Sequence, residues 1–207
     1  MAPELSAAAI EAAFGDSGDF VARDVVADGR RLRLYFVGGL VGGNLISDFV
    51  VKPLIQEVAG SAAAIRTEAA DGVVYSAACQ PVDTLEDALA KLLNGFAVLL
   101  FPEEARALAF ETKTPVNRGP SAPEVENTVK GAKDAFNENM RINTGMIRRH
   151  MRSADLHFTQ LVVGKQTATN VSVAWVRGLT NPQLVERTVA RPRSLEIDSF
   201  ATPAAVE

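Results

Sequence analysis

Residues 32–53 read LRLYFVGGLVGGNLISDFVVKP, and residues 171–192 read VSVAWVRGLTNPQLVERTVARP. Each stretch begins with a run of strand-forming residues, passes through a glycine-containing turn and ends in apolar residues at helical spacing. When the first stretch is placed over the second, glycine, proline and apolar positions coincide. The matched pairs are Val37 with Val176, Gly39 with Gly178, Leu40 with Leu179, Leu45 with Leu184, Val50 with Val189 and Pro53 with Pro192. The pattern predicts a strand–turn–helix element that the chain uses twice.

The sequence upstream of each stretch extends this similarity. A helix and a strand are predicted before each copy, and the turn Asp28-Gly29 favours a tight hairpin in the first. We therefore predict two helix–strand–strand–helix units related by internal duplication. The first copy comprises a helix over residues 5–14, strands over 20–26 and 32–37, and a helix over 44–59; the second comprises a helix over 137–151, strands over 158–163 and 168–176, and a helix over 182–189.

Additional elements are predicted between the two copies. Pro53 lies inside the helical pattern of residues 44–59 and predicts a kink or break, because proline lacks a backbone N–H donor. The other predicted elements are strands over 73–77, 97–101 and 105–110, a helix over 84–93 that ends at Asn94-Gly95, and a short strand over 195–197.

The domain boundary is predicted where turn formers accumulate. Pro115, Gly119-Pro120 and Pro123 punctuate a stretch with no helical or strand pattern. The fold class is therefore α/β, with two small α/β subdomains that have mixed sheets and are joined by a Pro-rich linker. The predicted parts are residues 1–112 (N-terminal subdomain), 113–127 (linker) and 128–207 (second subdomain, leading towards a membrane region that this sequence omits).

Composition restricts the function classes. The 207 residues carry a net charge of −4, which argues against nucleic acid as the main partner, and Cys79 is the only cysteine, so no intramolecular disulfide forms. The longest apolar run, residues 96–101, is far below the roughly 18 residues of a spanning helix, and the N-terminus lacks a secretory signal pattern. Residues 1–126 contain 10 Lys/Arg and 18 Asp/Glu, whereas residues 127–193 contain 11 and 4. This asymmetry predicts two surfaces with different neighbours.

Four glycines between a predicted strand and helix, Gly38, Gly39, Gly42 and Gly43, leave two interpretations open. Backbone N–H groups in such a loop can bind an anion at a helix N-terminus. A plain turn, with Gly39 and its counterpart Gly178 at positive φ, explains both copies and is favoured.

We find no pattern typical of an enzyme, a metal site or a cofactor site. Glu86-Asp87 lies in the first turn of a predicted helix, where negative charge is favourable, so it is interpreted as solvated. His150 and His157 are not at metal-ligand spacing. Trp175 and Phe158 alternate with apolar residues and are predicted to belong to the core.

The segment 129–152, VKGAKDAFNENMRINTGMIRRHMR, is basic and helical in pattern. Its basic set includes Arg141, Arg148, Arg149 and Arg152. Three interpretations remain open for it: a solvated helix, a surface that docks on an acidic partner, and a surface near anionic lipid headgroups.

This segment resembles a motif of the A subunits of GerA-family spore germinant receptors. The family motif, similar to Gly-Pro-Arg-Glu-Gly-Phe followed by Glu, Asn and an Ile/Leu-Arg-Arg-Arg run, corresponds here to Gly131–Phe136, Glu138, Asn143 and residues 147–150. Phe14-Gly15-Asp16-Ser17 and residues 178–182 (GLTNP) also resemble family stretches. The resemblance covers essentially the whole chain, although Ala132 and Ala135 replace the usual proline and glycine.

The resemblance implies a function and a location. It implies the soluble N-terminal domain of an A subunit that acts in receptor assembly and in signal transduction or ion-channel gating during spore germination, on the cytoplasmic (core) side of the spore inner membrane. The implied partners are the B and C subunits and other A subunits. We expect Arg141, Asn143, Arg148 and Arg149 to make partner contacts, such that replacing Arg148 and Arg149 by Glu impairs assembly without unfolding, and we expect Gly131, Phe136 and Glu138 to be structural. The alternative is a germinant-binding module with a ligand site between the subdomains.

Overall fold

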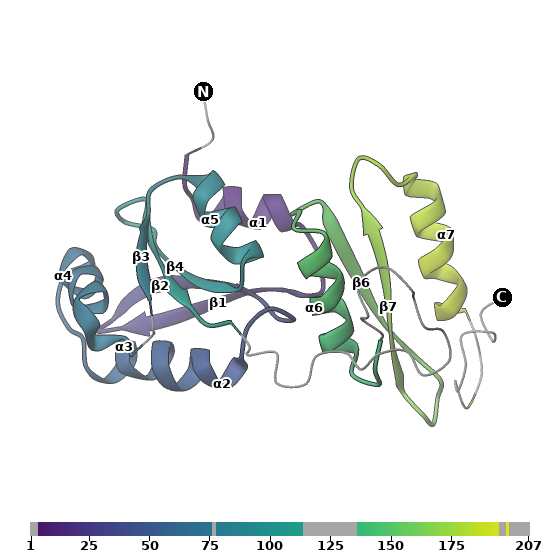
Figure 1. Ribbon diagram of the computed structural model, residues 1–207, viewed down its shortest axis with the longest axis horizontal. Coiled ribbons are helices and arrows are strands. Elements are labelled where there is room, and N and C mark those ends of the chain that lie inside the picture. Colours follow the sequence, from purple (N-terminus) through teal and green to yellow (C-terminus); the bar gives the residue numbers. More distant parts are fainter. Residues whose placement is uncertain (1–3, 76–77, 114–135, 195–197, 199–207) are drawn as a thin grey trace, which may run out of the picture.

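The computed structural model describes residues 4–75, 78–113, 136–194 and 198, which form two units with separate sheets (Figure 1). The first unit, residues 4–113, has a five-stranded sheet in the order β1-β2-β4-β5-β3, and the second unit, residues 136–194, has the two-stranded sheet β6-β7. The strands are β1 (Phe20–Ala27), β2 (Arg30–Val37), β3 (Cys79–Val82), β4 (Phe96–Phe101), β5 (Arg106–Glu111), β6 (Leu156–Val163) and β7 (Thr169–Val176). The helices are α1 (Ala7–Phe14), α2 (Gly43–Ile46), α3 (Lys52–Gln56), α4 (Ala62–Glu68), α5 (Leu85–Leu93), α6 (Met140–His150) and α7 (Pro182–Arg193).

The sheet of the first unit is covered by helices on both faces. Alternate residues of a strand point to opposite faces, so Leu32 and Leu34 of β2 belong to one core cluster and Tyr35 and Val37 to the other. The first cluster lies under α2, α3 and α4, and the second lies under α1 and α5, as Figure 1 shows for α2 and α3 against α1 and α5. The central strand β4 is buried along its whole length.

The second unit is a hairpin between two helices. Helix α6 contacts β7 on one side of the hairpin, and α7 packs mainly on β6 from the other side (Figure 1). Helix α7 begins as the sequence predicts, because the Asn181 side chain accepts from the Gln183 N–H and Pro182 occupies the first turn.

The predicted repeat is present in the order of elements. Residues 32–53 and 171–192 both fold as a strand, a turn and a helix, preceded by a helix and a paired strand. The turn Asp28-Gly29 has φ of 46° and 73°, as a two-residue type I′ hairpin turn requires. This arrangement supports the duplication. The second unit is smaller, because it has no counterparts of β3, β4, β5 and α5 within residues 136–194.

The α/β class is confirmed, but two details of the sheets differ from the expectations. Both sheets are antiparallel rather than mixed. Short turns impose this direction on the pairs β1–β2, β4–β5 and β6–β7, and the pairs β2–β4 and β3–β5 are antiparallel as well. The predicted strand over residues 73–77 is absent from residues 73–75, because Val73 ends a π-helical segment (Ala69–Val73), and residues 76–77 lie outside the described part; the observed strand begins at Cys79. Most of the predicted linker and the strand over 195–197 lie outside the described residues.

Pro53 does not break its helix. The chain is helical from Gly43 to Gln56, with a π-helical segment (Ser47–Val51) directly before α3. In this wider turn the Lys52 N–H donates to the Ser47 carbonyl, five residues back. The π-helical turn therefore shifts the hydrogen-bond register ahead of Pro53, where its missing N–H is tolerated in the first turn of α3.

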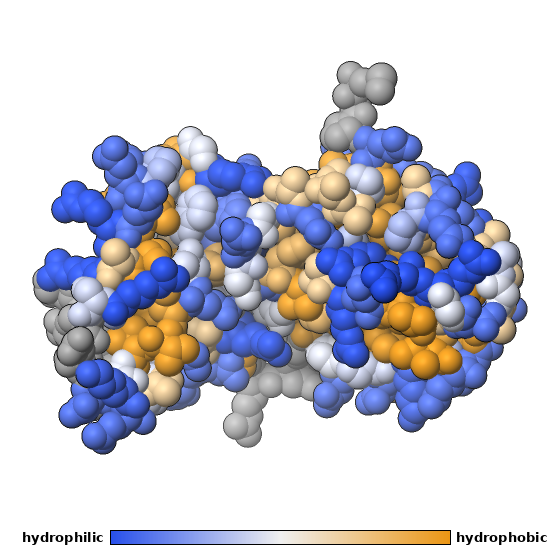
Figure 2. Space-filling view, turned by 180° about the vertical axis from the view of Figure 1, so that it is seen from behind, coloured by the Kyte–Doolittle hydropathy of each residue, from blue (hydrophilic) through white to orange (hydrophobic). Residues whose placement is uncertain are grey.

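Hydrophilic side chains cover much of the face shown in Figure 2, and apolar areas interrupt them on both units. Within the described part of the chain, no helix has both the length and the apolar character needed to cross a membrane.

Candidate functional site at the seam between the units

The two units meet where the loop that follows α1 runs alongside β6 and α6. The Gly18 N–H donates to the Phe158 carbonyl at 2.7 Å, and the Phe158 N–H donates to the Ser17 hydroxyl at 3.1 Å. The Gln160 side chain donates to the Gly18 carbonyl at 3.1 Å. We call this contact the seam; it consists of residues 17–19, Gly39, Gly145, Arg148 and residues 157–160.

A fully buried ion pair lies at the centre of the seam. Arg148 of α6 is 0% exposed and donates from Nε and Nη2 to the two carboxylate oxygens of Asp19, at 2.7 and 2.8 Å. Its Nη2 also donates to the Ser17 hydroxyl at 3.2 Å, and its Nη1 donates to the Ser153 carbonyl at 2.6 Å. All three guanidinium nitrogens are therefore hydrogen-bonded, which a buried charge requires.

Two aromatic rings enclose the guanidinium. The Arg148 Cζ lies 5.2 Å from the centre of the Phe158 ring and 5.8 Å from that of Phe14. The rings exclude water and present their faces to the cation, an arrangement that is favourable in a desolvated site. Phe14 belongs to the first unit and Phe158 to the second, so the cation bridges both cores.

The backbones of the two units also touch directly. A Cβ built on Gly145 of α6 would lie 2.1 Å from the Gly39 carbonyl oxygen, and one built on Gly39 would lie 2.7 Å from the backbone of Gly145. Both positions therefore require glycine for close approach. Gly178 has φ of 77°, as predicted, but Gly39 is not at positive φ, so the prediction for Gly39 is wrong.

Arg177 of the second unit forms hydrogen bonds with the C-terminal end of α1. Its Nη1 and Nη2 donate to the carbonyls of Ala12 and Ala13, at 3.1 and 2.7 Å, and it forms an ion pair with Asp155 at 2.9 Å. A cation is favourable at the C-terminal end of a helix, where carbonyl groups lack partners.

The predicted contact residues occupy different environments. Arg148 has no exposed surface that could contact a partner. Arg148→Glu would bury an acid beside Asp19, so the structure argues against the expectation that this change leaves the fold intact. Arg141 is exposed, and the partly buried Arg149 lines a pocket of about 370 Å³ between the units. Asn143 makes contacts within the chain, because its amide pairs with the backbone of Asn137 at 2.9 and 2.7 Å.

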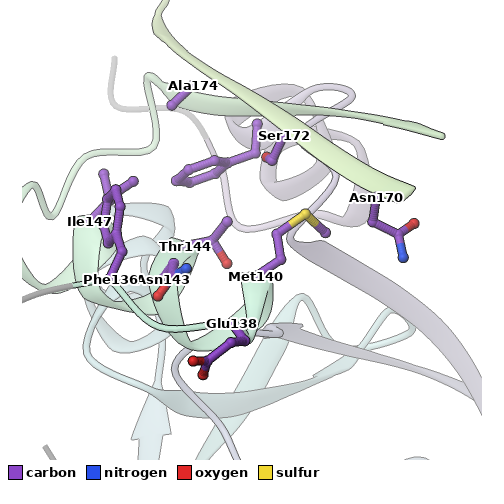
Figure 3. A pocket seen from close by; sticks show the side chains of 10 residues that line it. Phe136, Glu138, Met140, Asn143, Thr144, Ile147, Asn170, Ser172 and Ala174 are labelled. Carbon is purple, nitrogen blue, oxygen red and sulfur yellow. The ribbon is translucent and has the colours of Figure 1, made fainter. Parts of the chain in front are cut away.

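Three of the predicted residues line one groove between α6 and β7 (Figure 3). Phe136, Glu138 and Asn143 are among the residues around this groove of about 300 Å³, and Ser172 and Ala174 contribute its β7 side. Phe136 is 65% exposed. Gly131 lies outside the described residues.

The glycine-rich loop behaves as a turn. The N–H groups of Gly38, Leu40 and Gly42 donate to the carbonyls of Asp19, Val37 and Thr112, respectively. Hydrogen bonds inside the chain therefore use these donors, which favours the turn over the anion site.

The described residues contain no cluster of three or more His, Cys, Asp or Glu side chains that could hold a metal ion. Burial raises the pKa of the Cys79 thiol, so this cysteine is not activated as a nucleophile. The conspicuous chemistry of the seam is structural: a buried cation that holds two units together.

The comparisons with known proteins agree with this architecture. The family profile described as "Bacillus/Clostridium GerA spore germination protein" matches residues 8–207. The chain belongs to the GerA family. Relatives of this GerA-family chain include stage V sporulation protein AF of Bacillus subtilis (strain 168), 26% identical over 90% of the chain, and spore germination protein GerLA of Bacillus cereus, 24% identical over 93%.

A solved structure has the same fold. The crystal structure of the N-terminal domain of the A subunit of the Bacillus megaterium spore germinant receptor GerK3 matches with a TM-score of 0.71 and 21% identity, covering 96% of the GerA-family chain and 76% of that domain. The chain spans 38% and 40% of the lengths of the two relatives named above.

Sequence reasoning missed several residues of the seam in this GerA-family fold. Asp19, Gly145 and Arg177 were not predicted as functional. Ser17 lies in the stretch that carries the resemblance, and this was the available signal for the loop. Nothing in the sequence pairs Asp19 with Arg148, because 129 positions separate them.

The contact between Gly39 and Gly145 predicts that a glycine-to-alanine change inside helix α6 destabilises the protein, although such a change usually stabilises a helix. Gly145→Ala should lower the free energy of unfolding by roughly 1–3 kcal/mol, because the added methyl group collides with Gly39, although alanine in a helix is normally favoured by about 1 kcal/mol. Urea unfolding followed by circular dichroism measures the change. Gly43→Ala is the matched control: its Cβ meets nothing within 4 Å, so it should be neutral or stabilising. A stabilised Gly145→Ala variant would contradict the close approach.

The ion pair predicts a strong asymmetry between single and double substitution. Arg148→Met should cost about 3–5 kcal/mol, because it leaves the Asp19 carboxylate buried without its counter-ion. Combining Arg148→Met with Asp19→Leu should recover part of that loss, because no charge is then left buried. The same unfolding assay measures both variants. A single variant within 1 kcal/mol of the wild type would refute the predicted penalty.

Proposed function

We propose that this chain is the N-terminal domain of a germinant receptor A subunit and acts in receptor assembly and in signal transduction or channel gating during spore germination. The shared fold with the GerK3 N-terminal domain, across 96% of the chain, is the observation that carries the proposal. Family membership supports it, since several relatives are named spore germination proteins.

The seam suits a signalling role. A packed interface changes by switching between distinct packing arrangements and not by gradual deformation. The buried cation of the seam, with all its hydrogen bonds made, favours such switching between two positions of the units. A partner that contacts the second unit would then reposition the first unit through Asp19 and Gly39. In this proposal the domain lies on the cytoplasmic side of the spore inner membrane, and the parts that longer relatives possess attach it there.

The second unit provides the partner surface. Its residues 136–194 contain nine Lys/Arg and three Asp/Glu, which favours an acidic partner. Arg141 and Arg149 lie on the accessible part of α6. The B and C subunits and other A subunits are the proposed partners, and no nucleic acid is involved.

Charge reversal on α6 tests this proposal. Arg141→Glu combined with Arg149→Glu in the full-length subunit should reduce co-isolation of the receptor subunits from spores and slow nutrient germination, because both changes oppose an acidic partner. The melting temperature of the isolated domain should stay within a few degrees, because Arg141 is exposed and Arg149 is only partly buried, and exposed changes are usually worth less than about 0.5 kcal/mol.

The matched control reverses two exposed arginines on the first unit, Arg23→Glu and Arg31→Glu, and changes the net charge equally. It should leave receptor assembly unaffected. Normal receptor levels and germination in the α6 variant would refute the contact role, and equal defects in both variants would assign the effect to net charge.

One specific observation favours the alternative of a small-molecule site. Both units line the pocket of about 370 Å³: Leu93, Asn94 and Lys113 come from the first, and Arg149 and Arg152 from the second. The Arg152 side chain donates to the Asn94 amide oxygen at 2.9 Å, which orients it across the gap. Lys113 forms a salt bridge with Glu111 at 3.0 Å. Three cations in one pocket suit a small carboxylate or phosphate ligand.

Calorimetry of the domain against amino acids and sugars distinguishes the two functions. If the pocket is the site, an amino acid should bind saturably at micromolar concentration, and Arg152→Ala should weaken binding about tenfold, because a hydrogen bond to a charged group contributes roughly 1.5 kcal/mol or more. Arg23→Ala should bind as the wild type does. The absence of saturable heat for every ligand would leave the assembly function as the better supported one.

A further inference from the structure

His157 lies in the seam as a buried side chain with an unused polar atom. It is 4% exposed, and its Nε2 is buried without a hydrogen-bond partner. The ring stacks on Trp175 of β7, with centroids 4.6 Å apart and planes 19° apart. On another side its Cε1 faces Gly15, where an added Cβ would lie only 3.2 Å away. The imidazole is thus enclosed between the hairpin and the end of α1.

Charged groups of four segments surround this ring. Arg177 follows β7, Arg148 comes from α6, Asp155 precedes β6 and Asp19 follows α1. Each of the two acids is already paired with one of the two arginines. Neither carboxylate is therefore left unpaired for a third cation in the seam.

We propose that His157 is a pH-sensitive latch: the seam is closed when its imidazole is neutral and opens when the imidazole is protonated. The neutral ring can keep its single hydrogen on Nδ1, whereas an imidazolium carries a hydrogen on both nitrogens. Protonation therefore forces a buried N–H at Nε2 that has no acceptor. It would also place a new positive charge beside Arg148 and Arg177. Separation of α1 from the hairpin relieves both penalties by admitting water.

The direction of the pH dependence follows from this environment. Burial, followed by the charges of Arg177 and Arg148, lowers the pKa of His157 below its ordinary value. The open seam, with a solvated histidine, therefore binds the proton more readily than the closed seam. Closure is fully favourable above about pH 6.5 and weakens as the pH falls from that value towards the lowered pKa of the closed state.

Hydrogen exchange of individual backbone amides in the wild-type chain tests the latch. The Gly18 and Phe158 amides donate across the seam, whereas the Val98 amide lies in the buried β4 strand of the first unit. Between pH 7.5 and 5.5, after correction for intrinsic exchange rates, the opening equilibrium of Gly18 and Phe158 should rise up to about tenfold, because linkage to one proton gives at most tenfold per pH unit. The protection of Val98 should not change.

The chain offers a matched control, because it has two histidines and His150 is exposed. His157→Gln should abolish the pH response of the seam amides, and His150→Gln should retain it. Should His157→Gln fail to fold, His157→Phe keeps the stack on Trp175 without a titrating group. A response that persists in the His157 variants, or that spreads equally to Val98, would overturn the latch.

Discussion

The guanidinium of Arg148 is the group on which the association of the two units depends most. It is removed from water completely, and its hydrogen bonds end on a carboxylate and a hydroxyl of one unit and a backbone carbonyl of the other. Desolvating such a charge is costly, and the cost is offset only while every partner stays in place. The ion pair therefore contributes less to the free energy of unfolding than to the selection of a single relative position of the two units. If the units packed in any other position, an unpaired charge would be buried in an apolar site.

The glycine contact acts with the ion pair by fixing distance. Gly39 and Gly145 let the turn after β2 reach the backbone of α6, which brings Arg148 down to the loop of Asp19. Any larger side chain at either position would hold the units apart and lengthen the charged hydrogen bonds. The Gly39–Gly145 contact thus sets the distance between the units, and the Arg148–Asp19 pair sets their register. Arg177 adds hydrogen bonds to the carbonyl groups at the C-terminal end of α1.

The sequence predicted the elements that depend on local pattern. The hairpin at Asp28-Gly29, the helix that begins at Pro182 and the two equivalent stretches follow from residues close together in the chain. The seam did not follow, because a buried arginine and a solvated one look alike in a basic segment. Gly39 lies in a turn, as predicted, but a positive φ is not the reason that this position requires glycine. The reason is its close approach to helix α6, which is more than a hundred residues away in the sequence.

The unequal size of the two units predicts an order of folding in which the larger first unit forms before the second. The first unit has a five-stranded sheet with a core on each face, whereas the second unit has a single hairpin with one helix on either side. During synthesis, residues 4–113 leave the ribosome before α6 exists, and N-terminal domains generally fold first. Asp19 is then in place before Arg148 has been synthesised, so we expect the second unit to fold against the surface of the first. The first unit would then act as an intramolecular template for the smaller second unit.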